Sequence, residues 1–471
     1  MMTHVLQRWE PENPEFWHKQ GQAVARRNLW ISIPCLMLAF AVWMLWSVVA
    51  ANLDKAGFHF SKDQLFFLTA LPALSGATLR IFYSFLVPVF GGRKWTAIST
   101  ASLLIPAIGM GLALQDPSTS YSTLLGLALL CGLGGGNFSS SMANISFFFP
   151  KARKGYATGM NAGIGNLGVS VVQFVTPMVI SSAVFAASIS GQGFLFHDPK
   201  SGVESTFWLA NAGFIWVPFI VAATLAAWFG MNDIASAHAS LADQAVIFKR
   251  KHNWLMCWLY VGTFGSFIGF SAAFAMLIKA EFPEVAVAQY AFLGPLAGAL
   301  ARPLGGMLSD RIGGARLTLW VFLAMGLAIL LGILPALHTH QFALFLVSFI
   351  VMFILTGLGN GSTFCMIPLI FQTERERAAQ GQGEAALQQA RLDAAKESAA
   401  VLGFSGAIGA YGGFFIPQSF GTSIRMTGAP DMAMFIFVGF YASCMLITWW
   451  YYGSCNNGRR RLAASPGGLP P

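Results

Sequence analysis

Long apolar runs alternate with short polar stretches along almost the whole chain, and this pattern predicts the secondary structure. Most runs hold about 20 residues or more, the length at which an α-helix crosses the hydrocarbon core of a bilayer. The runs lie at 30–51, 65–89, 96–114, 121–148, 157–188, 206–230, 254–278, 287–308, 317–336, 341–371, 400–424 and 432–452. The pattern predicts an all-α integral membrane protein with twelve transmembrane helices.

The second six runs repeat motifs of the first six. Three pairs of segments match in the same order: SGATLRIFYSFLVPVFGG (75–92) with AGALARPLGGMLSDRIGG (297–314), CGLGGG (131–136) with TGLGNG (356–361), and GMNAGIGNLG (159–168) with GFSGAIGAYG (403–412). Two pseudo-symmetric six-helix halves around a mid-membrane site are the plan of a major facilitator transporter. The expected divisions are an N-terminal segment (1–29), a first half (30–230), a polar linker (231–253), a second half (254–453) and a tail (454–471).

Composition and charge add the expected orientation. The chain is 55% hydrophobic and only 10% charged, whereas a soluble domain has about 25% charged residues. Of the 28 Lys and Arg, 21 fall in the termini and the loops on one side and five in the loops on the other. Cytoplasmic loops carry such an excess, so we expect a multi-pass protein of the cell inner membrane with both termini cytoplasmic. The net charge of +9 then reflects topology and does not indicate a nucleic-acid partner.

The stretch GIGNLG at 163–168 matches G-x-G-x-x-G, the phosphate-binding pattern of dinucleotide folds. That pattern is informative only between a strand and a helix, whereas here it lies inside the fifth apolar run. Small residues in membrane helices instead let another backbone approach closely, so we expect a thin helix face on which the halves slide or close. The glycines expected in this packing and gating role are Gly159, Gly163, Gly165, Gly168, Gly403, Gly409 and Gly412.

Two arginines, Arg80 and Arg302, lie within apolar runs at matching positions of the repeat. A charge at mid-membrane faces a cavity or a partner, yet all 19 Asp and Glu and all eight His fall in termini, loops or run edges. We therefore expect the counter-ion to be a small anionic substrate, because a guanidinium fork suits a planar oxyanion. The alternative is that each arginine braces backbone carbonyls. An enzyme is not expected, since a haem oxidoreductase would need intramembrane His.

Polar and aromatic residues complete the candidate substrate site. The amide of Asn166 can donate to an anion or bridge two helices, and Gln173 has the same two interpretations. Phe138, Tyr260 and Phe264 can sandwich a flat anion and exclude water, although plain packing is the alternative for any one phenylalanine. The six cysteines show no metal-ligand spacing, and neither a metal nor a cofactor is expected.

Two polar segments carry further expectations. LSDRIGGAR at 308–316 resembles the cytoplasmic loop signature of major facilitators, where Asp310 would cap a helix or pair with basic groups and steady one conformation. The first-half copy, VPVFGGRKW, has Pro88 at the matching position, so this lock is expected in the second half only. The segment 372–398 is rich in Ala, Glu and Gln and predicts a cytoplasmic helix with glycine breaks, as a solvated connector or, alternatively, a regulatory element.

Over nearly its whole length, the chain resembles the nitrate/nitrite porter family of the major facilitator superfamily. The segments GMNAGIGNLGVSVVQ and GFSGAIGAYGGFFIPQ look like the paired signature of that family. The resemblance implies an anion clamp of two arginines, two hydrogen-bonding side chains and two phenylalanine rings: Arg80 and Arg302, Asn166 and Tyr260, and Phe138 and Phe264.

The function implied by the resemblance is transport of the small inorganic anions nitrate and nitrite through the lipid bilayer. The expected mode is exchange of one anion for the other by rocker-switch alternating access, by a monomer. Proton-coupled nitrate symport is an alternative, although it normally needs a titratable group in the path. A non-transporting nitrate receptor is a second alternative, from a different class of protein.

Overall fold

The computed structural model describes residues 4–185, 187–197, 204–235 and 246–453. Within these ranges, twelve helices are long and apolar enough to cross a membrane. They are built, in chain order, from α2 (Gln22–Trp43) with α3 (Trp46–Val49); α4 (Lys62–Phe90); α5 (Gly92–Ala101) with α6 (Leu104–Ala113); α7 (Tyr121–Phe148); α8 (Lys151–Ile180); α10 (Asn211–Phe214) with α11 (Val217–Gly230); α13 (Lys251–Tyr260) with α14 (Ser266–Glu281); α15 (Leu293–Ile312); α16 (Gly314–Ala328) with α17 (Leu334–His338); α18 (Phe342–Ala378); α19 (Glu384–Ala410) with α20 (Gly412–Thr427); and α21 (Asp431–Ile447).

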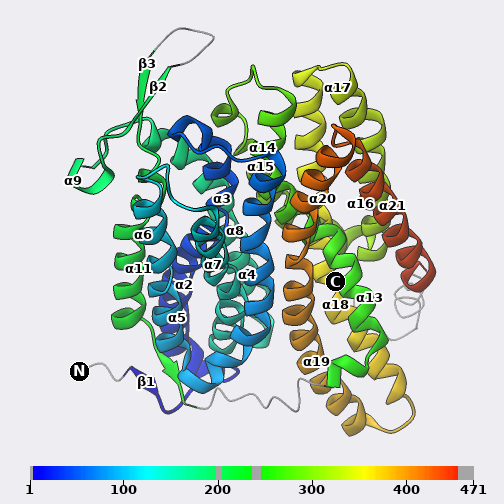
Figure 1. The fold of residues 1–471 in the computed structure, drawn as a ribbon. Helices are drawn as coiled ribbons and strands as arrows, with labels where there is room; N and C mark the ends of the chain where they lie inside the picture. The colour runs from blue at the N-terminus through cyan, green and yellow to red at the C-terminus, as the bar shows by residue number, and fades with distance from the viewer. Residues whose placement is uncertain (1–3, 186, 198–203, 236–245, 454–471) are drawn as a thin grey trace.

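The helices form two bundles side by side (Figure 1). The first bundle, drawn blue to green, ends with α11, and the second, drawn green to red, begins with α13. The predicted arrangement of two six-helix halves is therefore confirmed. Strands β2 (Phe194–His197) and β3 (Glu204–Phe207) extend from one end of the first bundle. We call this the hairpin end, and the opposite end, where β1 (Val5–Leu6) lies, the β1 end.

The internal repeat is visible in backbone conformation. Gly91 and Gly313, which the sequence alignment pairs, both have positive φ, 86° and 93°, and each joins two consecutive helices. Only glycine adopts such a conformation without strain. Glycines also let α7 approach α4 in the first half, where a Cβ on Gly135 would stand 2.8 Å from Gly76 Cα, and Gly357 meets Gly298 in the equivalent α18–α15 contact.

Two short sheets depart from the all-α expectation. Strands β2 and β3 pair antiparallel, and β1 pairs in parallel with β4 (Asp233–Ile234). Two predicted apolar runs differ from the observed helices near this hairpin. The run expected at 157–188 extends beyond the end of α8 at Ile180, and the run expected at 206–230 begins inside β3. These strands have two to four residues each, which is too few for periodicity to distinguish them from helix ends.

The described polar contacts between the halves run from the hairpin end to about mid-depth. Lys279 donates to Ala51 O at 2.7 Å and pairs with Asp54, and Arg425 pairs with Asp63 at 3.2 Å. Deeper in, Gln173 Nε2 donates to Ser271 O at 2.8 Å. The halves are thus closed together at the hairpin end.

Toward the β1 end, three glycines of the two repeated segments have no close neighbour. A Cβ added to Gly159 or Gly163 on α8, or to Gly403 on α19, would meet nothing within 4 Å. The described contacts thus join the halves at the hairpin end and at mid-depth, whereas Gly159, Gly163 and Gly403 face open space.

Candidate functional site

Arg80 lies two-thirds of the way along α4 and is fully buried. Its Nε donates to Gly135 O at 2.7 Å in the first half, and its Nη1 donates to Gly406 O at 2.8 Å in the second half. Its Nη2 is buried without a hydrogen-bond partner among the described residues. Arg80 thus braces carbonyls from both halves, as the alternative interpretation expects, yet keeps one donor nitrogen unsatisfied.

Aromatic rings surround the Arg80 guanidinium. Its Cζ lies 4.7 Å from the ring centroid of Phe138, 4.9 Å from that of Trp43 and 5.1 Å from that of Phe264. Ring faces attract a cation at these distances, and more strongly where water is excluded. The rings can hold the guanidinium plane in place without neutralising its charge.

A stack of rings leads from Arg80 to Arg302. Phe138 stacks on Phe264 with centroids 6.3 Å apart, and Phe264 stacks on Tyr260 at 5.5 Å. The Tyr260 hydroxyl then lies 3.5 Å from Arg302 Nη2, at the long limit of a hydrogen bond. The structure therefore brings five of the six predicted substrate residues into one chain of contacts.

Arg302 is held more loosely than Arg80. Besides the long contact to Tyr260, its Cζ lies 5.6 Å from the ring of Phe364, and its Nη1 is buried without a partner among the described residues. No carboxylate in the described part of the chain forms an ion pair with either arginine. A buried cation without a counter-ion strongly favours an anionic ligand, because the desolvation penalty of the charge is otherwise uncompensated.

The side-chain amides of Asn166 and Gln173, both on α8, differ in their hydrogen bonds. Asn166 is buried, and neither its nitrogen nor its oxygen has a partner among the described residues. Gln173, in contrast, donates to Ser47 Oγ at 3.1 Å and to Ser271 O, so it bridges helices. Asn253 on α13 is likewise buried with both side-chain polar atoms unpaired among the described residues, so the hydrogen-bond pattern alone does not single out Asn166.

The glycine-rich segments pack mainly within each half. A Cβ on Gly165 would stand 2.8 Å from Leu36, and Gly168 faces the carbonyl of Met37, both on α2. The second segment packs in the same way against its own half. There a Cβ on Gly409 would stand 2.8 Å from Tyr260 Cδ1, and Gly412 meets Gly265.

The expectation that the whole segment forms a sliding face between the halves therefore does not describe this conformation. Gly159, Gly163 and Gly403 face open space here. At Gly409, the absence of a side chain leaves room for the Tyr260 ring.

The first half contains the buried arginine–acid pair that the sequence predicted to be missing. Arg93 Nε lies 3.3 Å from Asp233 Oδ2, and the Arg93 backbone N–H donates to Asp233 Oδ1 at 2.8 Å. The prediction was wrong because the acid comes from β4, 140 residues further along the chain. Asp310 is exposed and, within the described residues, forms no ion pair in this conformation.

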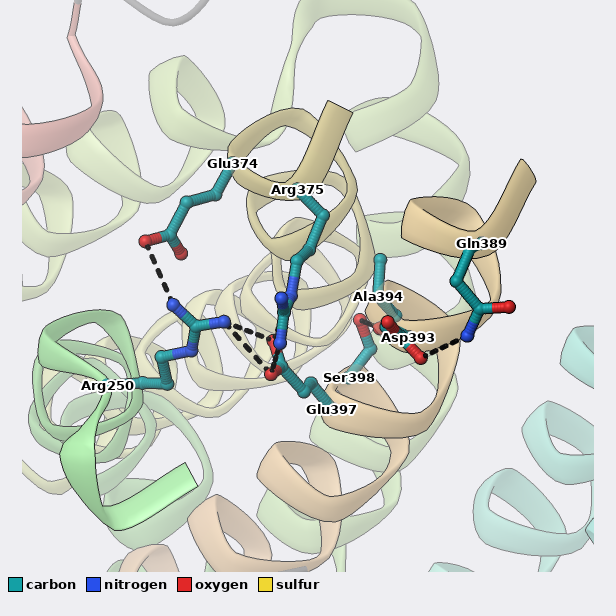
Figure 2. A network of polar contacts seen from close by, with 8 residues as sticks. All are labelled: Arg250, Glu374, Arg375, Gln389, Asp393, Ala394, Glu397 and Ser398. Atoms are coloured by element: carbon teal, nitrogen blue, oxygen red, sulfur yellow. Dashed lines mark hydrogen bonds and ion pairs between the residues drawn. The ribbon is translucent and has the colours of Figure 1, made fainter. Parts of the chain in front are cut away.

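The second half has its own cluster at Glu397, shown in Figure 2. Arg250 Nη2 donates to Glu397 Oε1 at 3.0 Å, and Arg375 Nε donates to Glu397 Oε2 at 3.2 Å. The expected glycine break is present as a turn with positive φ at Gly381 and Gly383 between α18 and α19. Because Glu397 is buried, segment 372–398 is not simply a solvated connector.

Several contributors to the site carried no usable signal in the sequence. The carbonyls of Gly135 and Gly406 are backbone groups, which every residue possesses. A π-helical turn, η5 (Val261–Gly265), follows Tyr260 and carries Phe264, and such turns recur at functional sites. Trp43 carried a weak signal, as one of several aromatic residues in the first apolar run.

Comparison with known proteins gives the family. Residues 32–388 match the family model described as Major Facilitator Superfamily. The chain belongs to this superfamily. It is 53% identical over 448 residues to a protein of Salmonella typhimurium named nitrate/nitrite transporter NarU, covering 95% of this chain and 96% of the relative. It is 41% identical to the probable nitrate/nitrite antiporter NarK2 of Thermus thermophilus, covering 94% and 95% of the two chains.

Solved structures support the fold independently. The xylose transporter XylE from E. coli, described as partially occluded and inward open, superposes with a TM-score of 0.64 at 12% identity, covering 91% of this chain and 98% of XylE. A bacterial homologue of the lysosomal transporter Spinster gives a TM-score of 0.62 at 16% identity, covering 92% of this chain and 97% of the homologue. At such identities the likeness establishes the major facilitator fold.

Proposed function

We propose that the chain carries nitrate and nitrite across the cytoplasmic membrane, exchanging one for the other by rocker-switch alternating access. The observation that carries this proposal is the pair of buried arginines, each with one donor nitrogen left unsatisfied and neither with a carboxylate partner in the described residues. The names of the relatives at 53% and 41% identity support the choice of anion.

The proposed substrate lies between Arg80 and Arg302, where the unsatisfied Nη2 and Nη1 atoms would each donate to one oxygen. Nitrate and nitrite are flat, so they can lie against the Phe138, Phe264 and Tyr260 rings while accepting hydrogen bonds at their edges. Asn166 would supply a further donor from α8. Metal and cofactor groups have no role in this proposal.

The excess of positive charge supports an orientation in which both termini are cytoplasmic. The hairpin end is then periplasmic, and the β1 end is cytoplasmic. Each half supplies one arginine, so a single chain completes the site, and we propose that the protein works as a monomer. The relatives at 53% and 41% identity are bacterial transporters, so we propose that this protein lies in the inner membrane.

Proton-coupled symport is the less favoured mode. A proton path needs a group that titrates in the path, and the described contacts of Arg80 and Arg302 involve carbonyls, rings and one tyrosine hydroxyl, but no Asp, Glu or His. A receptor without transport activity would need the same anion site, but no alternating access.

Reconstitution into liposomes separates these candidates. Vesicles loaded with nitrite should take up labelled nitrate rapidly, whereas vesicles loaded with sulfate should not. Measurable nitrate binding without any flux would favour the receptor, and flux of labelled sulfate equal to that of nitrate would contradict the proposed anion site.

A further inference from the structure

A groove at the β1 end lies between the start of α2 and the start of α8. Its volume is about 370 Å³, and its lining includes Arg26 and Trp30 from α2, Arg153 and Tyr156 from α8, and Trp17 from the preceding turn. None of the groove-lining residues is acidic. Within the described residues, neither Arg26 nor Arg153 forms an ion pair.

The groove continues into the lipid-facing surface of the bundle. Trp30 is 54% exposed and Tyr156 is 68% exposed. Further along α8, Met178 is also exposed, and its spacing places it on the same side of the helix as Met160. In a membrane this apolar stripe faces acyl chains, while tryptophan and tyrosine lie at the level of the headgroups.

The base of the groove contains a further donor. The side chain of Trp17 is 5% exposed, and its indole Nε1 is buried without a hydrogen-bond partner among the described residues. A buried indole N–H normally has an acceptor. The groove therefore presents two cations that form no ion pair within the described residues, and an apolar exit along the bilayer.

We infer that this groove binds an acidic phospholipid of the cytoplasmic leaflet. The phosphate lies between Arg26 and Arg153, and an acyl chain lies along the stripe that begins at Met160. Basic pockets between membrane helices on the cytoplasmic side are suited to anionic headgroups. The inference is independent of the transported anion. Only the choice of leaflet depends on the proposed orientation.

Native mass spectrometry of the purified protein in detergent tests this inference. Dioleoylphosphatidylglycerol should bind more tightly than dioleoylphosphatidylethanolamine, which has the same chains but no net charge. In the variant Arg26→Gln/Arg153→Gln the preference should fall roughly 10- to 30-fold, the effect expected for two arginines near a headgroup. The control Arg8→Gln/Lys19→Gln removes the same charge from residues that pair with Glu10 and Glu15, and should keep the preference.

Three results would overturn the inference. One is equal binding of the two lipids by the wild-type protein, which needs no variant and so does not depend on variant folding. Another is an unchanged preference in the Arg26→Gln/Arg153→Gln variant. The third is complete displacement of phosphatidylglycerol by equimolar glycerol 1-phosphate, which would indicate a site for the free anion rather than for a lipid.

Discussion

Arg80 and Arg302 occupy matching positions in the two halves, but their guanidinium groups make different contacts. Arg80 donates to carbonyls of both halves, whereas the described polar contact of Arg302 is one long contact to Tyr260. Arg80 therefore contributes to the stability of this conformation, in addition to the proposed anion binding. Arg302 is better placed to move with a substrate.

Replacing each arginine by lysine separates these roles. Lysine keeps the charge but loses the planar fork, and the loss of a charge-assisted hydrogen bond should reduce nitrate exchange roughly 10- to 100-fold in either variant. Arg80→Lys should also lower the melting temperature more than Arg302→Lys, because one ammonium cannot reproduce the two carbonyl contacts. Exchange near the wild-type rate in either variant would remove that residue from the substrate site.

Asn166 and Gln173 form a natural pair for comparison, since only one of them has protein partners. Asn166→Ala should raise the KM for nitrate roughly two- to tenfold, the effect of one lost hydrogen bond, without lowering thermal stability. Gln173→Ala should leave the KM nearly unchanged but weaken closure at the hairpin end. If Asn166→Ala destabilises the fold and leaves the KM unchanged, the amide has a structural role.

The candidate site can be proposed from residue type because an intramembrane arginine without an acidic partner has few interpretations. The repeat located both arginines, and the aromatic residues followed from the need to exclude water. Arg93 and Asp233 show the limit of this reasoning. Their pairing depends on where a strand 140 residues away returns, and no local pattern contains that information.

At the scale of helices, the glycines of α8 divide into a packed group and an exposed group. Gly168 faces the backbone of α2, whereas Gly163 faces open space. Gly163→Leu should therefore fold normally but block exchange, because its side chain obstructs the approach of the second half when the β1 end closes. Gly168→Leu should instead reduce yield and thermal stability. Normal exchange by folded Gly163→Leu protein would show that the halves do not close there.

The helices themselves were predicted well because bilayer thickness fixes their length. The same reasoning could not locate the π-helical turn in the seventh span, since a one-residue change in hydrogen-bond pattern leaves composition unchanged. It also missed the hairpin, whose strands resemble the ends of the adjacent apolar runs. Short elements and backbone irregularities are set by tertiary packing rather than by hydrophobic periodicity.

At the scale of the whole molecule, each end of the linker is fixed to a different half. Asp233 ties its start to Arg93 in the first half, and Arg250 ties its end to Glu397 in the second. Each half can then move as a rigid body. The ion pairs Lys279–Asp54 and Arg425–Asp63 join the two halves at the hairpin end.

Removing one of these ion pairs should favour opening at the hairpin end. Both pairs are partly exposed, so each contributes at most about 1 kcal/mol. Lys279→Met should raise the population open at the hairpin end by up to about fivefold, measured by spin-label distances across that end. Lys19→Met, which removes a cation whose ion pair with Glu15 lies within the N-terminal segment, is the control. An unchanged distance distribution in Lys279→Met would show that this pair does not hold the closed state.

The two arginines also supply a physical reason for the proposed exchange rather than net transport. If they stand about 6 Å apart in an occluded state, with an effective dielectric constant of about 20, they repel by roughly 3 kcal/mol. The empty occluded state is then populated on the order of a hundredfold less than it would be without this repulsion. A bound monovalent anion reduces the net charge of the site and bridges both guanidinium groups. The loaded carrier can therefore cross, while the empty carrier largely cannot.

Counterflow in proteoliposomes, with and without a proton gradient, tests this central claim most directly. Labelled nitrate should enter nitrite-loaded vesicles rapidly, at a rate nearly constant between about pH 6 and 8, because no histidine or carboxylate takes part. Anion-free vesicles should show little uptake even with an inward proton gradient. Strong nitrate accumulation in anion-free vesicles driven by that gradient would contradict the account and require proton coupling.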